Sequence, residues 1–100
     1  MYQVLFHADI KTDYDEAYAW YEDKLQGLGE RFLSAIRNKT DEIAKRHEAF
    51  GERTKKDYRE ARLDSFPFSI IYKLYKREKI IFVNSIHHHS KHPRKKYRKK

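Results

Sequence analysis

Two kinds of hydrophobic periodicity divide the chain. In the N-terminal half, apolar and aromatic residues recur every three or four positions, as in Tyr14, Ala17, Tyr18, Tyr21 and Leu25, which predicts helices with one buried face. Elsewhere, short runs rich in β-branched and aromatic residues are bounded by turn residues, which predicts strands. The expected elements, in order, are a strand at 2–7, helices at 12–25 and 29–47, and strands at 58–64, 68–75 and 79–86.

Local signals set the expected ends of the helices. Thr12, followed three residues later by Asp15, forms a variant of the capping box, so we expect the first helix to begin there. Gly27-Leu28-Gly29 is expected to end it, because glycine tolerates the left-handed backbone that turns a chain out of a helix. The polar, unperiodic residues 48–57 are expected to form a loop after the second helix.

The strand pattern indicates a sheet with one core face and one mixed face. In 68–75, Phe, Ile, Tyr and Leu alternate with Ser, Ile, Lys and Tyr, and 80–83 is apolar on both sides, as in an interior strand. The element order β-α-α-β-β-β predicts an α+β fold, in which a helical hairpin packs on one face of a mainly antiparallel four-stranded sheet. We expect residues 1–100 to form one domain, since 100 residues are too few for two cores.

Positive charge is concentrated at the C-terminus. Residues 87–100 contain seven Lys and Arg, four His and no acid, whereas the rest of the chain holds 16 Lys and Arg against 15 Asp and Glu. A basic tail at about 90–100 is typical of a protein that meets an anionic partner, such as nucleic acid or an acidic protein. Cysteine is absent, and no run approaches the ~18 apolar residues of a membrane span. We therefore expect a cytoplasmic protein without a membrane association.

Four motifs in one order resemble the RelE/ParE superfamily of toxins from bacterial type II toxin–antitoxin systems. Ala17-Tyr18-Ala19-Trp20-Tyr21-Glu22 resembles its A-x-x-W-Y segment, and Gly27-Leu28-Gly29-Glu30-Arg31-Phe32 resembles the opening of its second helix. The run from Arg62 to Tyr72, with Phe66-Pro67-Phe68 inside it, is similar to the family's strand entry. His87-His88-His89 with Pro93 and Tyr97 is similar to the segment that closes its last strand.

The resemblance implies a toxin that inhibits growth when free and is neutralised by a cognate antitoxin in a hetero-oligomer. The antitoxins of this superfamily are usually small, acidic and partly disordered. RelE-like members cut messenger RNA on the ribosome without a metal, whereas ParE-like members inhibit DNA gyrase and lack the nuclease residues. A third hypothesis is a non-toxic nucleic-acid-binding relative of the same fold, because a fold alone does not determine a function.

Metal-free RNA cleavage needs a base for the 2′-hydroxyl, cations for the phosphorane and an acid for the leaving oxygen. Histidine suits such roles because it titrates near neutral pH. The candidate catalytic residues are Arg62, His87, His89 and Tyr97, and His88 stands beside them. The candidate nucleic-acid-binding residues are Arg59, Lys91, Arg94, Lys95, Lys96 and Arg98. Ser69 departs from the nuclease pattern, since RelE-like enzymes carry an arginine in the corresponding strand.

Several of these residues also have plain structural interpretations. His87 could end a strand with backbone hydrogen bonds, Trp20 could be a core or helix-packing anchor, and the tail could be a solvated terminus. The three adjacent histidines could hold zinc or nickel, but no acid or cysteine lies near them in the sequence. We therefore expect neither a metal nor a cofactor.

Overall fold

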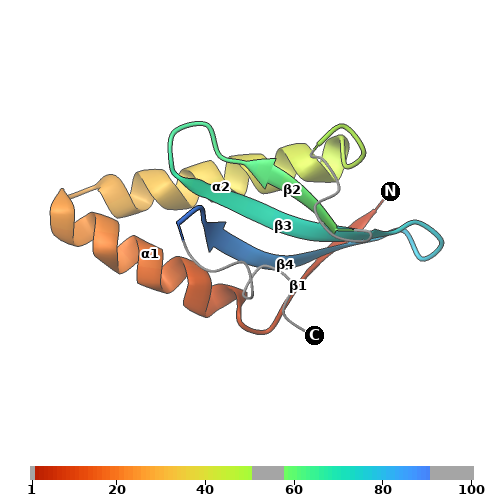
Figure 1. The fold of residues 1–100 in the computed structure, drawn as a ribbon, viewed down its shortest axis with the longest axis horizontal. Helices are drawn as coiled ribbons and strands as arrows, with labels where there is room; N and C mark the ends of the chain where they lie inside the picture. Colours follow the sequence, from red (N-terminus) through yellow and green to blue (C-terminus); the bar gives the residue numbers. More distant parts are fainter. Residues whose placement is uncertain (1, 51–57, 91–100) are drawn as a thin grey trace.

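The computed structural model describes residues 2–50 and 58–90. Its elements are β1 (Gln3–Phe6), α1 (Ile10–Lys24), α2 (Leu28–Lys45), β2 (Tyr58–Arg62), β3 (Phe68–Tyr75) and β4 (Ile80–His88) (Figure 1). The strands form one sheet in the order β1-β4-β3-β2, with β1 parallel to β4 and the other pairs antiparallel. The predicted α+β fold and its order of elements are confirmed.

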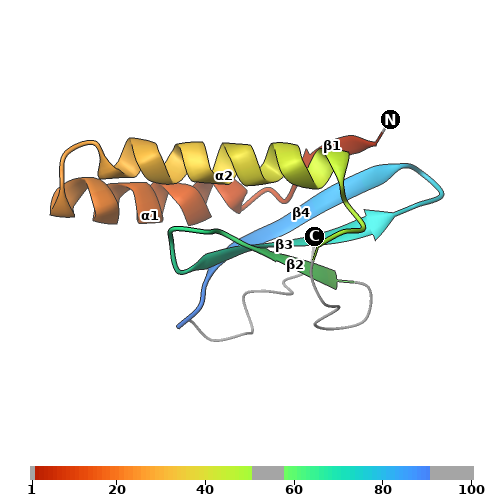
Figure 2. The ribbon, with the colours of Figure 1, turned by 90° about the horizontal axis from the view of Figure 1, so that it is seen from above.

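The helical hairpin lies on one face of the sheet, so the molecule has two layers (Figure 2). Phe32 and Ile43 of α2 and Ile70, Tyr72 and Ile81 of the sheet are completely buried between them. Burying each aliphatic or aromatic side chain of this size contributes roughly 1.5–3 kcal/mol, so these layers hold the domain together. Within the described residues, no helix is long and apolar enough to cross a membrane.

A carboxylate and two glycines make the turn between the helices. Gly27 has φ +89°, a left-handed conformation that favours glycine, and it leads directly into α2. The carboxylate of Glu22 accepts hydrogen bonds from the backbone N–H of Gly27 (2.9 Å) and of Gly29 (3.0 Å). A Cβ atom on Gly29 would lie 2.8 Å from the Tyr18 ring. The positive φ of Gly27 and the close approach of the Tyr18 ring to Gly29 therefore explain why both positions of Gly27-Leu28-Gly29 are glycine.

The bounds of several elements differ from the sequence-based predictions. The first helix begins at Ile10, after Asp9, so Thr12 lies inside it and the capping box does not form; the Asp15 carboxylate pairs instead with Lys11 Nζ at 2.6 Å. The second helix ends at Lys45 and not at 47. The first strand is limited to Gln3–Phe6 and the second ends at Arg62 and not at 64, whereas the last strand continues to His88.

Trp20 is not a core residue. Its side chain is 59% exposed, because Ala17 and Tyr21 occupy the buried face of α1 and Trp20 is one position away from it. The prediction that Trp20 is a core residue was wrong. Its ring contacts Tyr21 edge-on, with the centroids 5.1 Å apart.

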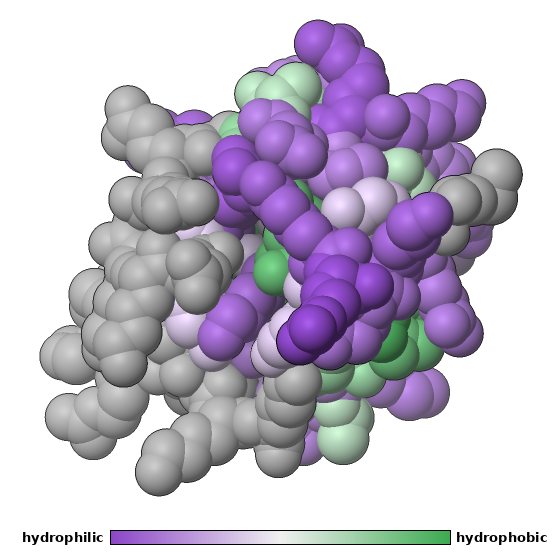
Figure 3. Space-filling model, turned by 90° about the vertical axis from the view of Figure 1, so that its right-hand side faces the viewer, coloured by the Kyte–Doolittle hydropathy of each residue, from purple (hydrophilic) through white to green (hydrophobic). Residues whose placement is uncertain are grey.

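The end of the molecule that carries the β3–β4 turn is mostly hydrophilic (Figure 3). Residues 76–79 of this turn, Lys-Arg-Glu-Lys, are all exposed. The large apolar side chains that are exposed belong instead to β1 (Leu5 and Phe6) and to α1 or the residue after it (Trp20 and Leu25), among the residues described.

Candidate functional site on the outer face of the sheet

A row of three residues crosses the sheet on the face opposite the helices. Arg62 of β2 is paired with Ser69 of β3, and Ser69 is paired with His87 of β4. The next row, Ala61, Ile70 and Ile86, belongs to the core, and side chains alternate along a strand. Arg62, Ser69 and His87 therefore share the outer face, with Arg62 and His87 about 10 Å apart across two strand spacings.

A β-bulge in β4 decides which histidine faces outward. Ile71 pairs with Ser85 and Tyr72 pairs with Val83, so Asn84 is an extra residue on β4. Before the bulge, Ile81 and Val83 point into the core, and after it Ile86 does. Simple alternation from Val83 would have placed Ser85 and His87 toward the helices, whereas the bulge places His87 beside Ser69 on the outer face.

Each of the three adjacent histidines has a different environment. His87 is buried, with 4% of its surface exposed. His88 points to the helix side, where its ring lies edge-on to Phe68 (4.9 Å between centroids) and its Nδ1 accepts a hydrogen bond from the backbone N–H of Ser90 (3.0 Å). His89 Nε2 shares a hydrogen bond with the Ser69 hydroxyl at 2.8 Å. Ser69 thus connects the outer-face row to the chain after β4.

Arg59 lies on the other side of β2, toward the helices. Its guanidinium Nη1 donates to the backbone carbonyls of Glu48 (3.3 Å) and Phe50 (3.2 Å), so it fastens the chain that leaves α2. Its neighbour across the strands, Tyr72, donates from its hydroxyl to the carbonyl of His47 at 2.7 Å. Burial raises the pKa of Tyr72 to about 12, and the charge of Arg59 opposes this shift.

The structure thus brings Arg62, His87 and His89 together around Ser69, and it places Arg59 elsewhere. Of the remaining candidates, Tyr97, Lys91, Arg94, Lys95, Lys96 and Arg98 lie outside the described residues. Among residues 2–50 and 58–90, no group of three or more His, Asp or Glu side chains is arranged to hold a metal ion. The roles assigned to all these residues stay predictions.

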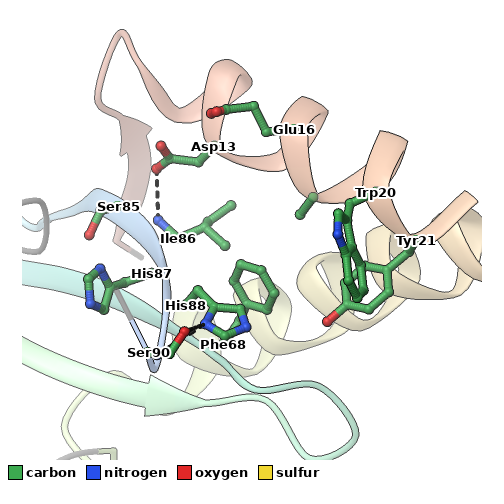
Figure 4. A pocket seen from close by; sticks show the side chains of 11 residues that line it. Asp13, Glu16, Trp20, Tyr21, Phe68, Ser85, Ile86, His87, His88 and Ser90 are labelled. Atoms are coloured by element: carbon green, nitrogen blue, oxygen red, sulfur yellow. Dashed lines mark hydrogen bonds between the residues drawn. The ribbon is translucent and has the colours of Figure 1, made fainter. Parts of the chain in front are cut away.

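A pocket that sequence reasoning missed lies between α1 and the end of β4 (Figure 4). Its volume is about 460 Å³. Its lining includes Trp20, Phe68 and His88, together with the acids Asp13 and Glu16. The acids lie on α1 at positions that the helical pattern assigns to solvent, and Trp20 was expected in the helix packing, so the sequence gives no signal that these residues flank a cavity.

A helical hairpin packed on a four-stranded mixed sheet is the fold of the RelE-like and ParE-like toxins. A family model described as the ParE toxin of the type II toxin–antitoxin system parDE matches residues 4–93. The chain therefore belongs to the ParE toxin family. No curated protein sequence matches it.

Solved toxins share the fold at low sequence identity. A chain of the chromosomal ParDE system from P. aeruginosa has a TM-score of 0.67 at 18% identity, covering 88% of this chain and 96% of that one. The isolated E. coli RelE toxin has a TM-score of 0.65 at 18% identity, covering 92% and 88%. A mutant of E. coli RelE in complex with a peptide of the antitoxin RelBc has a TM-score of 0.60 at 20% identity, covering 85% and 80%. These likenesses concern the fold.

Proposed function

We propose that this toxin stops growth by binding DNA gyrase, as the resemblance to ParE-like toxins implies, and not by cleaving RNA. The observation that carries the proposal is the identity of Ser69 at the centre of the outer-face row. RNA cleavage needs cations that stabilise the negative charge of the phosphorane. A neutral hydroxyl in the middle of the row cannot supply that charge, and it is already hydrogen-bonded to His89.

The histidines support the same interpretation. A general acid or base must come within about 3 Å of the proton that it moves. His87 has 4% of its surface exposed, and His88 is packed against Phe68 on the opposite side of the strand. His89 shares its Nε2 hydrogen bond with Ser69. The imidazoles therefore fit a role in holding the end of β4 better than a role in proton transfer.

The proposal includes a cognate antitoxin and a toxin–antitoxin hetero-oligomer. The family model supports this, because it describes the toxin of a toxin–antitoxin system. The complex of RelE with an antitoxin peptide, among the similar structures, supports it as well. A cytoplasmic location belongs to the same proposal, because gyrase and ribosomes work there. With a formal charge of +8, the free toxin would attract an acidic antitoxin and nucleic-acid-bound targets alike.

The test compares the two targets directly. We expect purified toxin to inhibit DNA supercoiling by gyrase and to leave messenger RNA intact on translating ribosomes. In cells, induction should cause DNA breaks and an SOS response, with transcripts of full length by primer extension. His89→Ala should keep gyrase inhibition. Cutting of messenger RNA at codon positions, lost in Arg62→Ala and His87→Ala, would overturn the proposal in favour of a RelE-like nuclease.

A further inference from the structure

The pocket between α1 and β4 exists because the first strand is short. β1 has four residues and pairs only with Ile80 to Val83, so the second half of β4 has α1 beside it in place of a strand. The Asp13 carboxylate accepts a hydrogen bond from the backbone N–H of Ile86 at 3.0 Å across this gap. The remaining space between helix and strand is the pocket of about 460 Å³, within the usual size of ligand sites.

The wall of the pocket is apolar and aromatic. Phe68, Ile86 and Tyr21 come from the edge of the core, and Trp20 lines the pocket beside Tyr21 (Figure 4). Trp20 is 59% exposed, which is unusual for the largest side chain of a small domain. Exposed tryptophan beside an apolar cavity is typical of the residues that dominate protein–protein binding energy.

The rim of the pocket is acidic in a strongly basic protein. Asp13 and Glu16 lie one helical turn apart on α1, and Glu16 is exposed, whereas the whole chain carries a formal charge of +8. The Trp20 ring already attracts a cation, since Lys24 Nζ lies 5.0 Å from its centroid. An apolar wall beside two carboxylates suits a ligand that joins an apolar side chain to a guanidinium or ammonium group.

We propose that this pocket binds a segment of the antitoxin that places an apolar side chain against Trp20 and Phe68, with a neighbouring Arg or Lys beside Glu16. The charge of the rim determines which segment of the antitoxin fits. A mostly acidic antitoxin is attracted by the basic surface of the toxin as a whole, whereas the acidic rim of the pocket favours a positively charged segment of the antitoxin. The pocket would thereby fix the register in which the antitoxin lies on the toxin. This inference rests on the antitoxin partnership proposed above and is independent of the gyrase target.

The first test uses Trp20 as its own reporter, because it is the chain's one tryptophan. In the complex of full-length toxin with its cognate antitoxin, we expect the Trp20 emission to shift to the blue and its quenching by acrylamide to fall. Trp20→Ala should weaken antitoxin binding at least about tenfold. Leu25→Ala is the matched control, since Leu25 is 58% exposed and does not line the pocket, and it should change binding less than about twofold.

The second test addresses the cation. Acetyl-leucyl-arginine amide is titrated into the toxin while the indole N–H resonance of Trp20 is followed, with the uncharged citrulline analogue as the matched probe. We expect Glu16→Gln to weaken the arginine probe about two- to fivefold and to leave the citrulline probe unchanged. Glu78→Gln, in the exposed β3–β4 turn, should affect neither probe.

Two results would overturn the inference. One is a Trp20 emission that does not change in the antitoxin complex, together with equal affinities of Trp20→Ala and Leu25→Ala. The other is equal binding of the arginine and citrulline probes, which would remove the cationic part. None of these measurements involves gyrase, so a failure here and a failure of the gyrase proposal can be told apart.

Discussion

The Asp13 carboxylate accepts a hydrogen bond from the backbone N–H of Ile86 at 3.0 Å, although the two residues are 73 positions apart in the sequence. The bond occupies a donor on the strand edge that β1 is too short to cover. An unpaired donor on a strand edge can pair with another chain, so Asp13 both ties α1 to β4 and closes that edge.

Replacing this carboxylate should destabilise the domain. We expect Asp13→Ala to lower the free energy of unfolding by about 1–3 kcal/mol, because the partly buried Ile86 N–H loses its partner. Urea denaturation followed by circular dichroism measures the change. Asp15→Ala is the control, since Asp15 pairs with Lys11 at an exposed site and should cost less than about 1 kcal/mol. Equal losses in the two variants would contradict a special role for Asp13.

The helical turn offers a second prediction. Gly29→Ala should cost about 1–3 kcal/mol of stability, because the new Cβ would meet the Tyr18 ring at 2.8 Å and Glu22 Oε1 at 2.9 Å. Combining it with Tyr18→Ala should recover part of the loss, which a double-mutant cycle would detect. Gly27→Ala has no atom in its way, so its cost of about 1–2 kcal/mol should come from the positive φ and should not depend on Tyr18.

The buried Tyr72 predicts a pH dependence. Its pKa is about 12 in the folded protein against an ordinary value of 10.0, so between these values the folded state keeps a proton that the unfolded state loses. The stability contributed by this group is therefore complete below pH 10 and is lost as the pH rises toward 12, by about 2–3 kcal/mol in total. Tyr72→Phe should be less stable by about 1 kcal/mol near pH 7, since it loses the hydrogen bond to His47, and it should decline less steeply above pH 10. Parallel decline of the two proteins would refute the assignment.

Arg59 and Arg62 lie on opposite faces of β2, so replacing each with alanine should have a different effect on stability. Arg59→Ala should lower stability by about 1–2 kcal/mol, because the carbonyls of Glu48 and Phe50 lose a charged donor. Arg62 is exposed on the outer face, so Arg62→Ala should change stability by less than about 0.5 kcal/mol. Thermal unfolding of the two variants measures the difference. A toxic and fully stable Arg59→Ala would argue against its anchoring role.

Local signals in the sequence were enough for most of the fold. Tyr72 was expected in the core because of its alternation with Lys73, and Gly27 was expected to turn the chain because of its backbone freedom, and both expectations are confirmed. Trp20 was misplaced because a helical face about 100° wide leaves its neighbours ambiguous, and the tertiary packing selected Tyr21.

The outer-face row could be predicted only in part. If the alternation of the last strand is continued past residue 86, it puts His87 and His89 on one side of the chain, and both lie near Ser69 in the structure. The contacts of Arg59 with Glu48 and Phe50 depend on how the chain returns from α2, and the pocket depends on how far α1 lies from β4. Such distances are set by packing across the whole domain, and no local pattern of residues encodes them.

The extra residue Asn84 sets the phase of the last strand. If Asn84 were deleted, Ser85 would follow Val83 directly, and strict alternation would still turn Ile86 inward and His87 outward. The strand can therefore lose this one residue without exchanging its two faces, so the surfaces on either side of the sheet are protected against that change in length.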